Sequence, residues 1–279
     1  MGTFCQGNTA GAKLTNLEFL YIVVNLLSSM DLKGFFLLLA MELAVIVARG
    51  RDNSISCYPV VETIHRDNIC HIVKAPANVK WKTRELATEV AFNAVNSLEG
   101  AGVFAVELFL TKDGQILLNE VAPRPHNSGH HTIESCYTSQ YEQHLRAVVG
   151  LPLGDPSLKT PAAIMYNILG EEEGDIGFQL AHQLIKRALT IPGATVHWYD
   201  KPEMRKQRKM GHITIVGPSL SNIESNLAVV VEGKRLDDKT AASISLRSTN
   251  TLLALDVVVE DMLLTYLPNT YVTLLDTSY

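Results

Sequence analysis

The sequence predicts an α+β fold, in which an antiparallel sheet with packed helices is followed by a small β-rich domain. Pairs of apolar segments separated by short polar turns indicate β-hairpins. Residues 81–98 instead place apolar side chains at every fourth position, which is typical of a helix that covers a sheet. The 279 residues are 47% hydrophobic and 19% charged, which is enough apolar material for one large domain or two small ones.

The expected elements can be assigned in order along the chain. In residues 43–61 the polar stretch RGRDNS separates the apolar runs LAVIVA and ISCYPVV, so a hairpin is expected there. A second, tighter hairpin at residues 103–121 joins VFAVELFL to QILLNEV through TKDG. The remaining expected elements are a short strand at 69–73, the helix at 81–98 closed by Gly100, helices at 139–149 and 178–189, and the strand pair VHWYD and HITIVG.

Proline and glycine divide the chain into four expected segments. Pro152, Gly154, Pro156 and Pro161 mark a boundary after the first sheet region. The segments are an atypical apolar N-terminal stretch at 1–41, a sheet domain at 42–155, a small C-terminal domain at 156–226 and a tail without a clear fold signal at 227–279.

The apolar start of the chain is interrupted by polar positions. Asp31, Lys33 and Gly34 divide the strongly apolar residues 17–41. A membrane helix needs about 20 apolar residues, and a charge at its centre is costly. We therefore do not expect this stretch to span a membrane, and basic residues typical of a signal peptide are nearly absent before it. A buried core segment and a non-native start are the two alternatives, and the second is preferred.

The overall charge and the cysteines argue against several classes of function. The net charge is −5 and the isoelectric point is about 6.0, so no nucleic-acid partner is expected. The four cysteines are widely separated and form no CxxC pair. They are expected to be reduced thiols of an intracellular protein, not a disulfide framework or a zinc site.

Two glutamates interrupt the otherwise apolar strands of the second hairpin. A two-residue Asp-Gly turn would pair Lys112 with Gln115. Counting outward then places Glu107 opposite Glu120 on one face, with Cβ atoms about 4.5–5.5 Å apart. Like charges in this position destabilise a sheet unless the carboxylates are paired, protonated or bound to metal. The pair therefore predicts a magnesium site, to which Asn119 could add an amide oxygen.

Other interpretations of this hairpin stay open. A solvent-facing hairpin can carry two ordinary glutamates without any metal. A four-residue loop would still keep both glutamates on the same face. A three-residue loop would put them on opposite faces, and the argument for a metal site would fail.

The loop after Glu120 is crowded with hydrogen-bond donors. Such a rigid loop suits an anionic substrate beside a metal, although a solvated loop is the simpler alternative for any one residue. The loop contains Arg124 between two prolines, then His126, Asn127, Ser128, Gly129 and His130. A basic cluster that would suit a phosphate monoester, or form an ordinary surface patch, contains Lys201, Arg205, Lys206, Arg208, Lys209 and His212.

A long segment after the second hairpin resembles a known enzyme family. The run NEVAPRPHNSGHHTIESCYTSQYEQHLRAVVGLPLG is similar to the ATPase subunit of phosphoribosylaminoimidazole carboxylase, also called carboxyaminoimidazole ribonucleotide synthetase, an ATP-grasp family of purine biosynthesis. The runs ELAVIVARGRDNSISCYPVVETIHRDNICHIVKAPANV and KPEMRKQRKMGHITIVGPSLSNIE look like the same family, of plant and fungal type. The resemblance implies that residues 42–155 are the C-terminal part of an ATP-grasp domain and that residues 156–226 are the small C-terminal domain of the ATPase subunit.

The resemblance also implies an activity and roles for individual residues. The activity would be that of an ATP-grasp carboxylase or ligase, which carboxylates aminoimidazole ribonucleotide with bicarbonate, ATP and Mg²⁺ through carboxyphosphate. Glu107 and Glu120 match the magnesium ligands. Arg124, His126 and Asn127 match the catalytic loop; Glu42, His65, Asn119 and Glu120 match nucleotide contacts; and Ser128, Gly129, Lys201, Arg205 and Arg208 match ribonucleotide contacts.

The chain departs from this family at both ends, so a truncated piece is expected. No N-terminal Rossmann-like domain, phosphate-binding glycine loop or following carboxylase motif is readable. Three interpretations remain: an active ligase, a non-catalytic fragment with weak nucleotide or metal binding or subunit pairing, and a membrane-tethered protein. The resemblance allows a homodimer and implies a plastid or the cytoplasm, although no transit peptide is readable.

Overall fold

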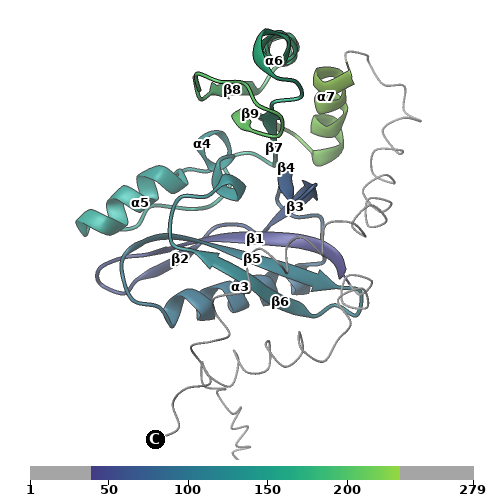
Figure 1. The fold of residues 1–279 in the computed structure, drawn as a ribbon. Coiled ribbons are helices and arrows are strands. Elements are labelled where there is room, and N and C mark those ends of the chain that lie inside the picture. Colours follow the sequence, from purple (N-terminus) through teal and green to yellow (C-terminus); the bar gives the residue numbers. More distant parts are fainter. Residues whose placement is uncertain (1–38, 233–279) are drawn as a thin grey trace, which may run out of the picture. The chain divides into compact units, whose positions relative to one another are not determined.

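The computed structural model of the chain describes residues 39–232 (Figure 1). These residues form a nine-stranded sheet in the order β6-β5-β1-β3-β4-β7-β9-β8, with β2 paired to β1 outside this path. The predicted α+β class with an antiparallel sheet is confirmed. The strands are β1 Leu39–Arg49, β2 Ile55–Cys57, β3 Val61–Arg66, β4 Ile69–Ala75, β5 Gly102–Thr111, β6 Ile116–Ala122, β7 Ala162–Leu169, β8 Ala194–Trp198 and β9 Lys209–Gly217.

The first predicted hairpin is divided differently in the structure. The run ISCYPVV, expected to be one strand, contributes to two short strands, β2 and β3, and both pair with β1. Pro59 lies between them and has no N–H to continue a ladder. Tyr58 turns into the core there, where it is 2% exposed and its hydroxyl donates to the carbonyl of Thr138 at 2.9 Å.

Helices cover both faces of the strands β1, β5 and β6. The helix α3 (Trp81–Asn96) packs Ala87, Ala91 and Val95 on one face. The helix α5 (Gln140–Val149) lies over the opposite face (Figure 1). The hydroxyl of Ser139 accepts from the backbone N–H of Glu142 at the start of α5, and Gly150 ends the helix in the left-handed region at φ 80°.

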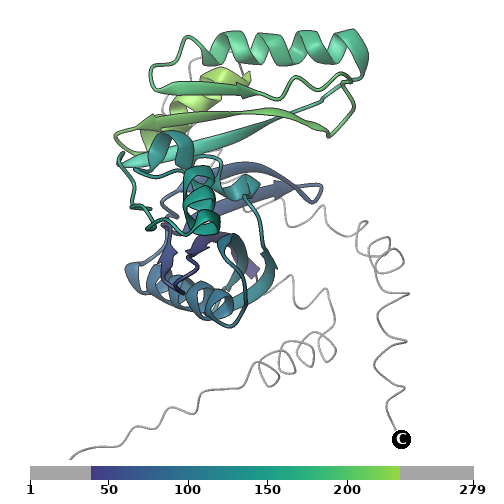
Figure 2. The ribbon, with the colours of Figure 1, turned by 90° about the vertical axis from the view of Figure 1, so that its left-hand side faces the viewer.

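The C-terminal strands continue the same sheet. The strand β7 pairs with β4 on one side and with β9 on the other. The helices α6 (Gly174–Ala188) and α7 (Leu220–Glu232) pack on one face of β7 and β9 in a single apolar cluster (Figure 2). The sequence analysis assigned neither β7 nor α7, and α7 runs across residue 226, where the small domain was expected to end.

The other face of this sheet is covered by a short 3-10 helix, η1 (Asn127–Gly129), and by α4 (Thr132–Ser135). Residues 233–279 of the predicted tail and residues 1–38 of the predicted apolar N-terminal segment lie outside the described residues. Within residues 39–232, no helix has the length and apolar character needed to cross a membrane.

Candidate functional site

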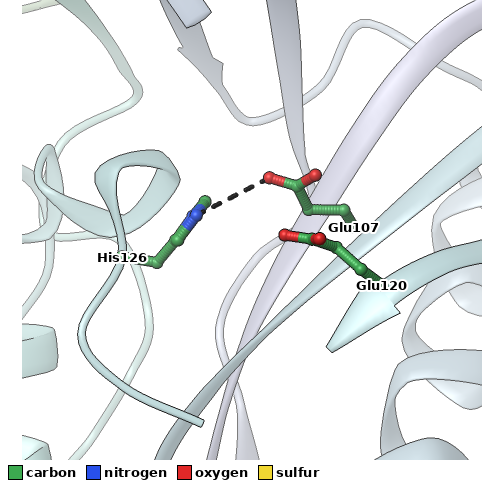
Figure 3. Close-up of side chains that lie close together, drawn as sticks. All are labelled: Glu107, Glu120 and His126. Atoms are coloured by element: carbon green, nitrogen blue, oxygen red, sulfur yellow. Dashed lines mark ion pairs between the residues drawn. The ribbon is translucent and has the colours of Figure 1, made fainter. Parts of the chain in front are cut away.

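The two glutamates of the second hairpin stand opposite each other across β5 and β6 (Figure 3). Burial and the nearby charge of Glu120 raise the pKa of Glu107. The amide of Asn119 donates to Glu107 Oε2 at 3.4 Å, which partly offsets this effect. The predicted opposed pair is therefore confirmed, and its mutual repulsion is present in the folded chain.

The prediction that a two-residue turn produces this pairing is wrong. The backbone N–H of Thr111 donates to the carbonyl of Gln115, so three residues form the loop and not two. Gly114 takes φ +88°, as the left-handed position of such a loop requires. A three-residue loop alone would place the glutamates on opposite faces. A β-bulge between Leu118 and Glu120 inserts one extra residue, Asn119, and returns Glu120 to the face of Glu107.

His126 is the third member of the cluster. Its Nε2 lies 3.7 Å from Glu107 Oε1, and both carboxylates point toward the ring (Figure 3). Burial is the main cause that lowers the pKa of His126 to about 4. The imidazole is therefore neutral at neutral pH and has a nitrogen lone pair.

These three side chains have the geometry and chemistry to hold a divalent cation. One ligand atom from each of Glu107, Glu120 and His126 lies within 4.8 Å of the other two. Carboxylate oxygens suit Mg²⁺ and Mn²⁺, and a neutral imidazole is a ligand for transition metals. A cation would also relieve the repulsion that raises the pKa of Glu107. The donor set therefore fits a metal ion, and His126 adds a nitrogen that the sequence analysis did not include among the ligands.

Glu42 and His65 lie on the same face of the sheet. Glu42 on β1 pairs in register with Thr63 on β3, and the Glu42 carboxylate forms an ion pair with His65 Nδ1. The charges of both residues also act on Glu107. The structure thus brings the two predicted nucleotide contacts next to the predicted metal ligands.

Irregular pairing adjoins several of these positions. A second irregularity lies between β3 and β4. Ile64 pairs with Ile72 and His65 pairs with Cys70, so His71 is an extra residue of β4 without a partner on β3. A third irregularity lies between β7 and β9, where Met210, next to Lys209, has no partner on β7. Bulges change the direction of neighbouring side chains and are common next to functional sites. Here they place Glu120, His65 and Lys209 on one face of the sheet.

Lys209 is a site residue that the sequence analysis left in the basic cluster. Burial lowers its pKa, and the negative charge of Glu107 acts in the opposite direction. Its carbonyl accepts from Lys201 Nζ at 2.6 Å, which connects the predicted ribonucleotide contact Lys201 to the cluster. A lysine directly before the apolar run of β9 is the sequence signal that could have identified it.

The remaining predicted cations are placed differently. Arg124 is exposed, and its charge acts on both His126 and Lys209, so it lies near these two site residues. Arg205 forms an ion pair with Glu203, and Arg208 Nη1 donates to the Glu203 carbonyl at 2.9 Å. Both arginines therefore contact Glu203 in the loop before β9.

The predicted catalytic residue Asn127 is engaged in a buried amide pair. Its Nδ2 donates to Asn167 Oδ1 at 2.9 Å, and Asn167 Nδ2 donates back to Asn127 Oδ1 at 2.7 Å. Asn167 is 0% exposed on β7 and also donates to the carbonyl of Cys70. Ser128 and Gly129 are buried as well. These contacts favour a role for Asn127 in fixing the loop, not in touching substrate.

A column of histidines connects this loop to the C-terminal strands. The ring centroid of His212 on β9 lies 4.9 Å from that of His130 and 4.4 Å from that of His197. The hydroxyl of Tyr199 lies 2.8 Å from His212 Nδ1, and Glu134 Oε1 lies 2.7 Å from His197 Nε2. Burial lowers the pKa of His212 to about 3 and that of His130 to about 4, so both rings pack as neutral groups.

Two family models match separate parts of the chain. Residues 35–141 match the ATP-grasp domain, and residues 163–226 match the phosphoribosylaminoimidazole carboxylase C-terminal domain. A curated relative from Vigna aconitifolia, named "Phosphoribosylaminoimidazole carboxylase, chloroplastic", is 83% identical over 205 residues, which are 74% of this chain and 37% of the relative. A relative from Schizosaccharomyces pombe, named "Phosphoribosylaminoimidazole carboxylase", is 45% identical over 222 residues, which are 78% of this chain and 40% of the relative.

A solved structure gives the same result for the fold. The N5-carboxyaminoimidazole synthase of Aspergillus clavatus, in complex with ADP and 5-aminoimidazole ribonucleotide, matches with a TM-score of 0.65 and 42% identity. The match covers 70% of this chain and 52% of that one. The chain spans less than half the length of the two curated relatives. The family predicted from the motifs is confirmed, and the chain belongs to the phosphoribosylaminoimidazole carboxylase family of ATP-grasp proteins.

Proposed function

We propose that this chain contributes to the ATP- and magnesium-dependent carboxylation of aminoimidazole ribonucleotide with bicarbonate in purine biosynthesis. The observation that carries the proposal is the cluster of Glu107, Glu120 and His126, whose ligand atoms lie within 4.8 Å of one another. The names of the relatives and the bound ligands of the Aspergillus structure support the substrate and the nucleotide.

The carboxylates and the imidazole would hold the metal that accompanies the nucleotide. When bound, Mg²⁺ would neutralise charge on the phosphate oxygens during phosphoryl transfer. Glu107 and Glu120 supply the hard oxygen ligands, and their β-ladder fixes the spacing between them. Positioning of this kind carries most of the catalysis in phosphoryl transfer.

The cations around the cluster would hold the anionic reactants. Lys209 lies close enough to Glu107 for their charges to interact, and Arg124 and Lys201 act on Lys209. A half-buried lysine attracts an anion more strongly than an exposed one because water screens its charge less. These residues would bind the bicarbonate-derived group and the phosphate of the ribonucleotide next to the metal.

The compartment and the assembly stay predictions from the resemblance. The name of the Vigna relative includes the word chloroplastic, which supports a plastid rather than the cytoplasm. Expression of the native transcript with a fluorescent C-terminal fusion tests this location. Pairing into a homodimer stays a prediction, and sedimentation equilibrium at several protein concentrations tests it.

The test of the proposed function is a turnover assay on the purified chain. ADP release is followed with ATP, Mg²⁺, bicarbonate and aminoimidazole ribonucleotide, and each component is omitted in turn. The proposal expects ADP release that requires all four and that Glu120→Gln abolishes. Metal-dependent nucleotide binding without turnover would instead favour the alternative of a non-catalytic binding fragment.

A further inference from the structure

One buried side chain contacts both backbone polar groups of His126, and the N–H of Gly129 also donates to the His126 carbonyl at 3.0 Å. The N–H of His126 donates to Gln140 Oε1 at 2.9 Å, and Gln140 Nε2 donates to the carbonyl of His126 at 2.8 Å. Gln140 is 0% exposed and is the first residue of α5. A side-chain amide with both contacts replaces the ladder partner that a strand residue would have. The backbone on both sides of the His126 side chain is therefore anchored to the helix α5.

The N–H of His126 fixes which way the Gln140 amide points, because a backbone N–H can only donate and therefore meets Oε1. In this orientation the amide Nε2 also lies 3.0 Å from His130 Nδ1, to which it can donate. A Cβ atom added at Gly129 would lie 2.4 Å from Gln140 Oε1 and 2.8 Å from Ile46 Cγ1. A glycine at this position is therefore what permits the close approach of the amide to the loop.

The same helix carries a second buried glutamine with the same kind of contact. Gln143 Nε2 donates to the carbonyl of Gly154 at 2.9 Å, and the N–H of Gly154 donates to Gln143 Oε1 at 2.7 Å. Gln143 is also 0% exposed. It holds the loop after α5, away from His126 in the sequence, so it is a matched structural control.

We infer that Gln140 is a positioning residue, which holds the His126 imidazole at the carboxylates of Glu107 and Glu120. His126 lies on a loop, and its Nε2 is 3.7 Å from Glu107 Oε1. Outer contacts that orient a ligand side chain typically change metal affinity by about 10–100-fold when they are removed. The inference rests on the proposed function because it assigns His126 to the metal and nucleotide site.

The test compares Gln140→Met with Gln143→Met. Methionine keeps the length of the side chain but cannot hydrogen-bond to the loop. Mn²⁺ affinity, measured by electron paramagnetic resonance with the metal alone, is expected to fall about tenfold in Gln140→Met. The affinity is expected to stay within about twofold in Gln143→Met. Thermal unfolding should shift in both variants, because each leaves one backbone N–H, that of His126 or of Gly154, without its partner.

A second variant covers the case in which Gln140→Met does not fold. Gln140→Glu keeps the volume and the acceptor for the His126 N–H, but its carboxylate cannot donate to the His126 carbonyl. Its Mn²⁺ affinity is expected to lie between those of the wild type and Gln140→Met. Wild-type affinity in both Gln140 variants would overturn the inference, since the Asn127–Asn167 pair alone would then suffice to place the loop. An equal loss in Gln143→Met would overturn it too.

A second measurement separates this inference from the proposed function. The imidazole signals of His126, assigned by nuclear magnetic resonance with His126→Gln, are expected to shift in Gln140→Met and to stay in place in Gln143→Met. If the wild type binds no Mn²⁺, the metal part of the proposed function fails, while these signals still decide whether Gln140 positions His126. Unshifted signals in Gln140→Met would contradict the positioning role.

Discussion

His126 Nε2 lies 3.7 Å from Glu107 Oε1, although one residue belongs to a loop and the other to the strand β5. Burial lowers the pKa of His126 to about 4 and raises the pKa of Glu107. At neutral pH the ring is neutral, so it does not cancel the carboxylate charge. The charge of the Glu107–Glu120 pair is therefore offset in part by Lys209 and otherwise left for a bound cation to balance.

Glu120→Gln is expected to stabilise the metal-free chain and to weaken metal binding. Removing one of two opposed carboxylates relieves repulsion worth about 0.5 kcal/mol in a β-ladder. The same change removes a metal ligand, so the stabilisation that added Mn²⁺ gives should nearly disappear. Thermal unfolding with and without Mn²⁺ measures both effects. The control is Glu89→Gln on the exposed side of α3, and a metal response in Glu120→Gln equal to that of the control would contradict the metal assignment.

Lys209→Met is expected to weaken binding of anionic ligands at the site. The change keeps the apolar stem of the half-buried side chain but removes the charge that interacts with Glu107 and Arg124. We expect the affinity for aminoimidazole ribonucleotide, measured by calorimetry, to fall at least about tenfold, which corresponds to 1.4 kcal/mol. Arg205→Met, at an exposed residue that pairs with Glu203, should have a much smaller effect. Equal losses in the two variants would place the anion at the loop before β9.

Folding stability is expected to fall below about pH 6.5 because of buried neutral histidines. His131 is 1% exposed, and burial lowers its pKa to about 3. Between the unfolded pKa of about 6.5 and this value, the unfolded state binds a proton that the folded state does not. The free energy of unfolding should therefore decrease by up to about 1.4 kcal/mol per pH unit for this residue as the pH falls, and should not change above pH 7.

Urea unfolding at pH 7, 6 and 5 checks this prediction. His131→Gln should reduce the slope of stability against pH, whatever its effect at pH 7. His182→Gln, at an exposed position on α6, should keep the wild-type slope. Identical slopes in His131→Gln and the wild type would show that His131 does not contribute to the acid sensitivity.

Gly114→Ala is expected to destabilise the chain through the backbone alone. Gly114 has φ +88°, and a Cβ atom added there would meet nothing within 4 Å. Alanine in the left-handed region costs about 1 kcal/mol, whereas asparagine tolerates it better. Chemical denaturation should therefore rank the wild type above Gly114→Asn and Gly114→Asn above Gly114→Ala. If alanine were neutral, the three-residue loop would not be the turn of this hairpin.

The sequence predicted the site more accurately than it predicted the hairpin that forms it. The opposed pair Glu107 and Glu120 was reached through a two-residue turn, and the real turn has three residues. The bulge at Asn119 cancels that error. The Asp-Gly pair marks the position of a turn but does not fix the length of its loop, and a bulge is stabilised by packing on both faces of the strand. The alternation of apolar residues along a strand does not show where a bulge inserts one extra residue.

The sequence by itself determined the family, most of the strands and helices, and the opposed carboxylates Glu107 and Glu120, whereas β7, α7 and the place of Lys209 came only from the structure. Motif, hydrophobic periodicity and turn chemistry are local properties, so each is visible in a short window. Tertiary structure decided that β7 pairs with β4, which brings Asn167 and Lys209 to the face of Glu107. It also decided that Gln140 and Asn167 hold the loop of His126 and Asn127. Such contacts join residues far apart in the chain. Buried polar groups need hydrogen-bond partners, but which residue is the partner depends on how the elements pack and is not visible in a short stretch of sequence.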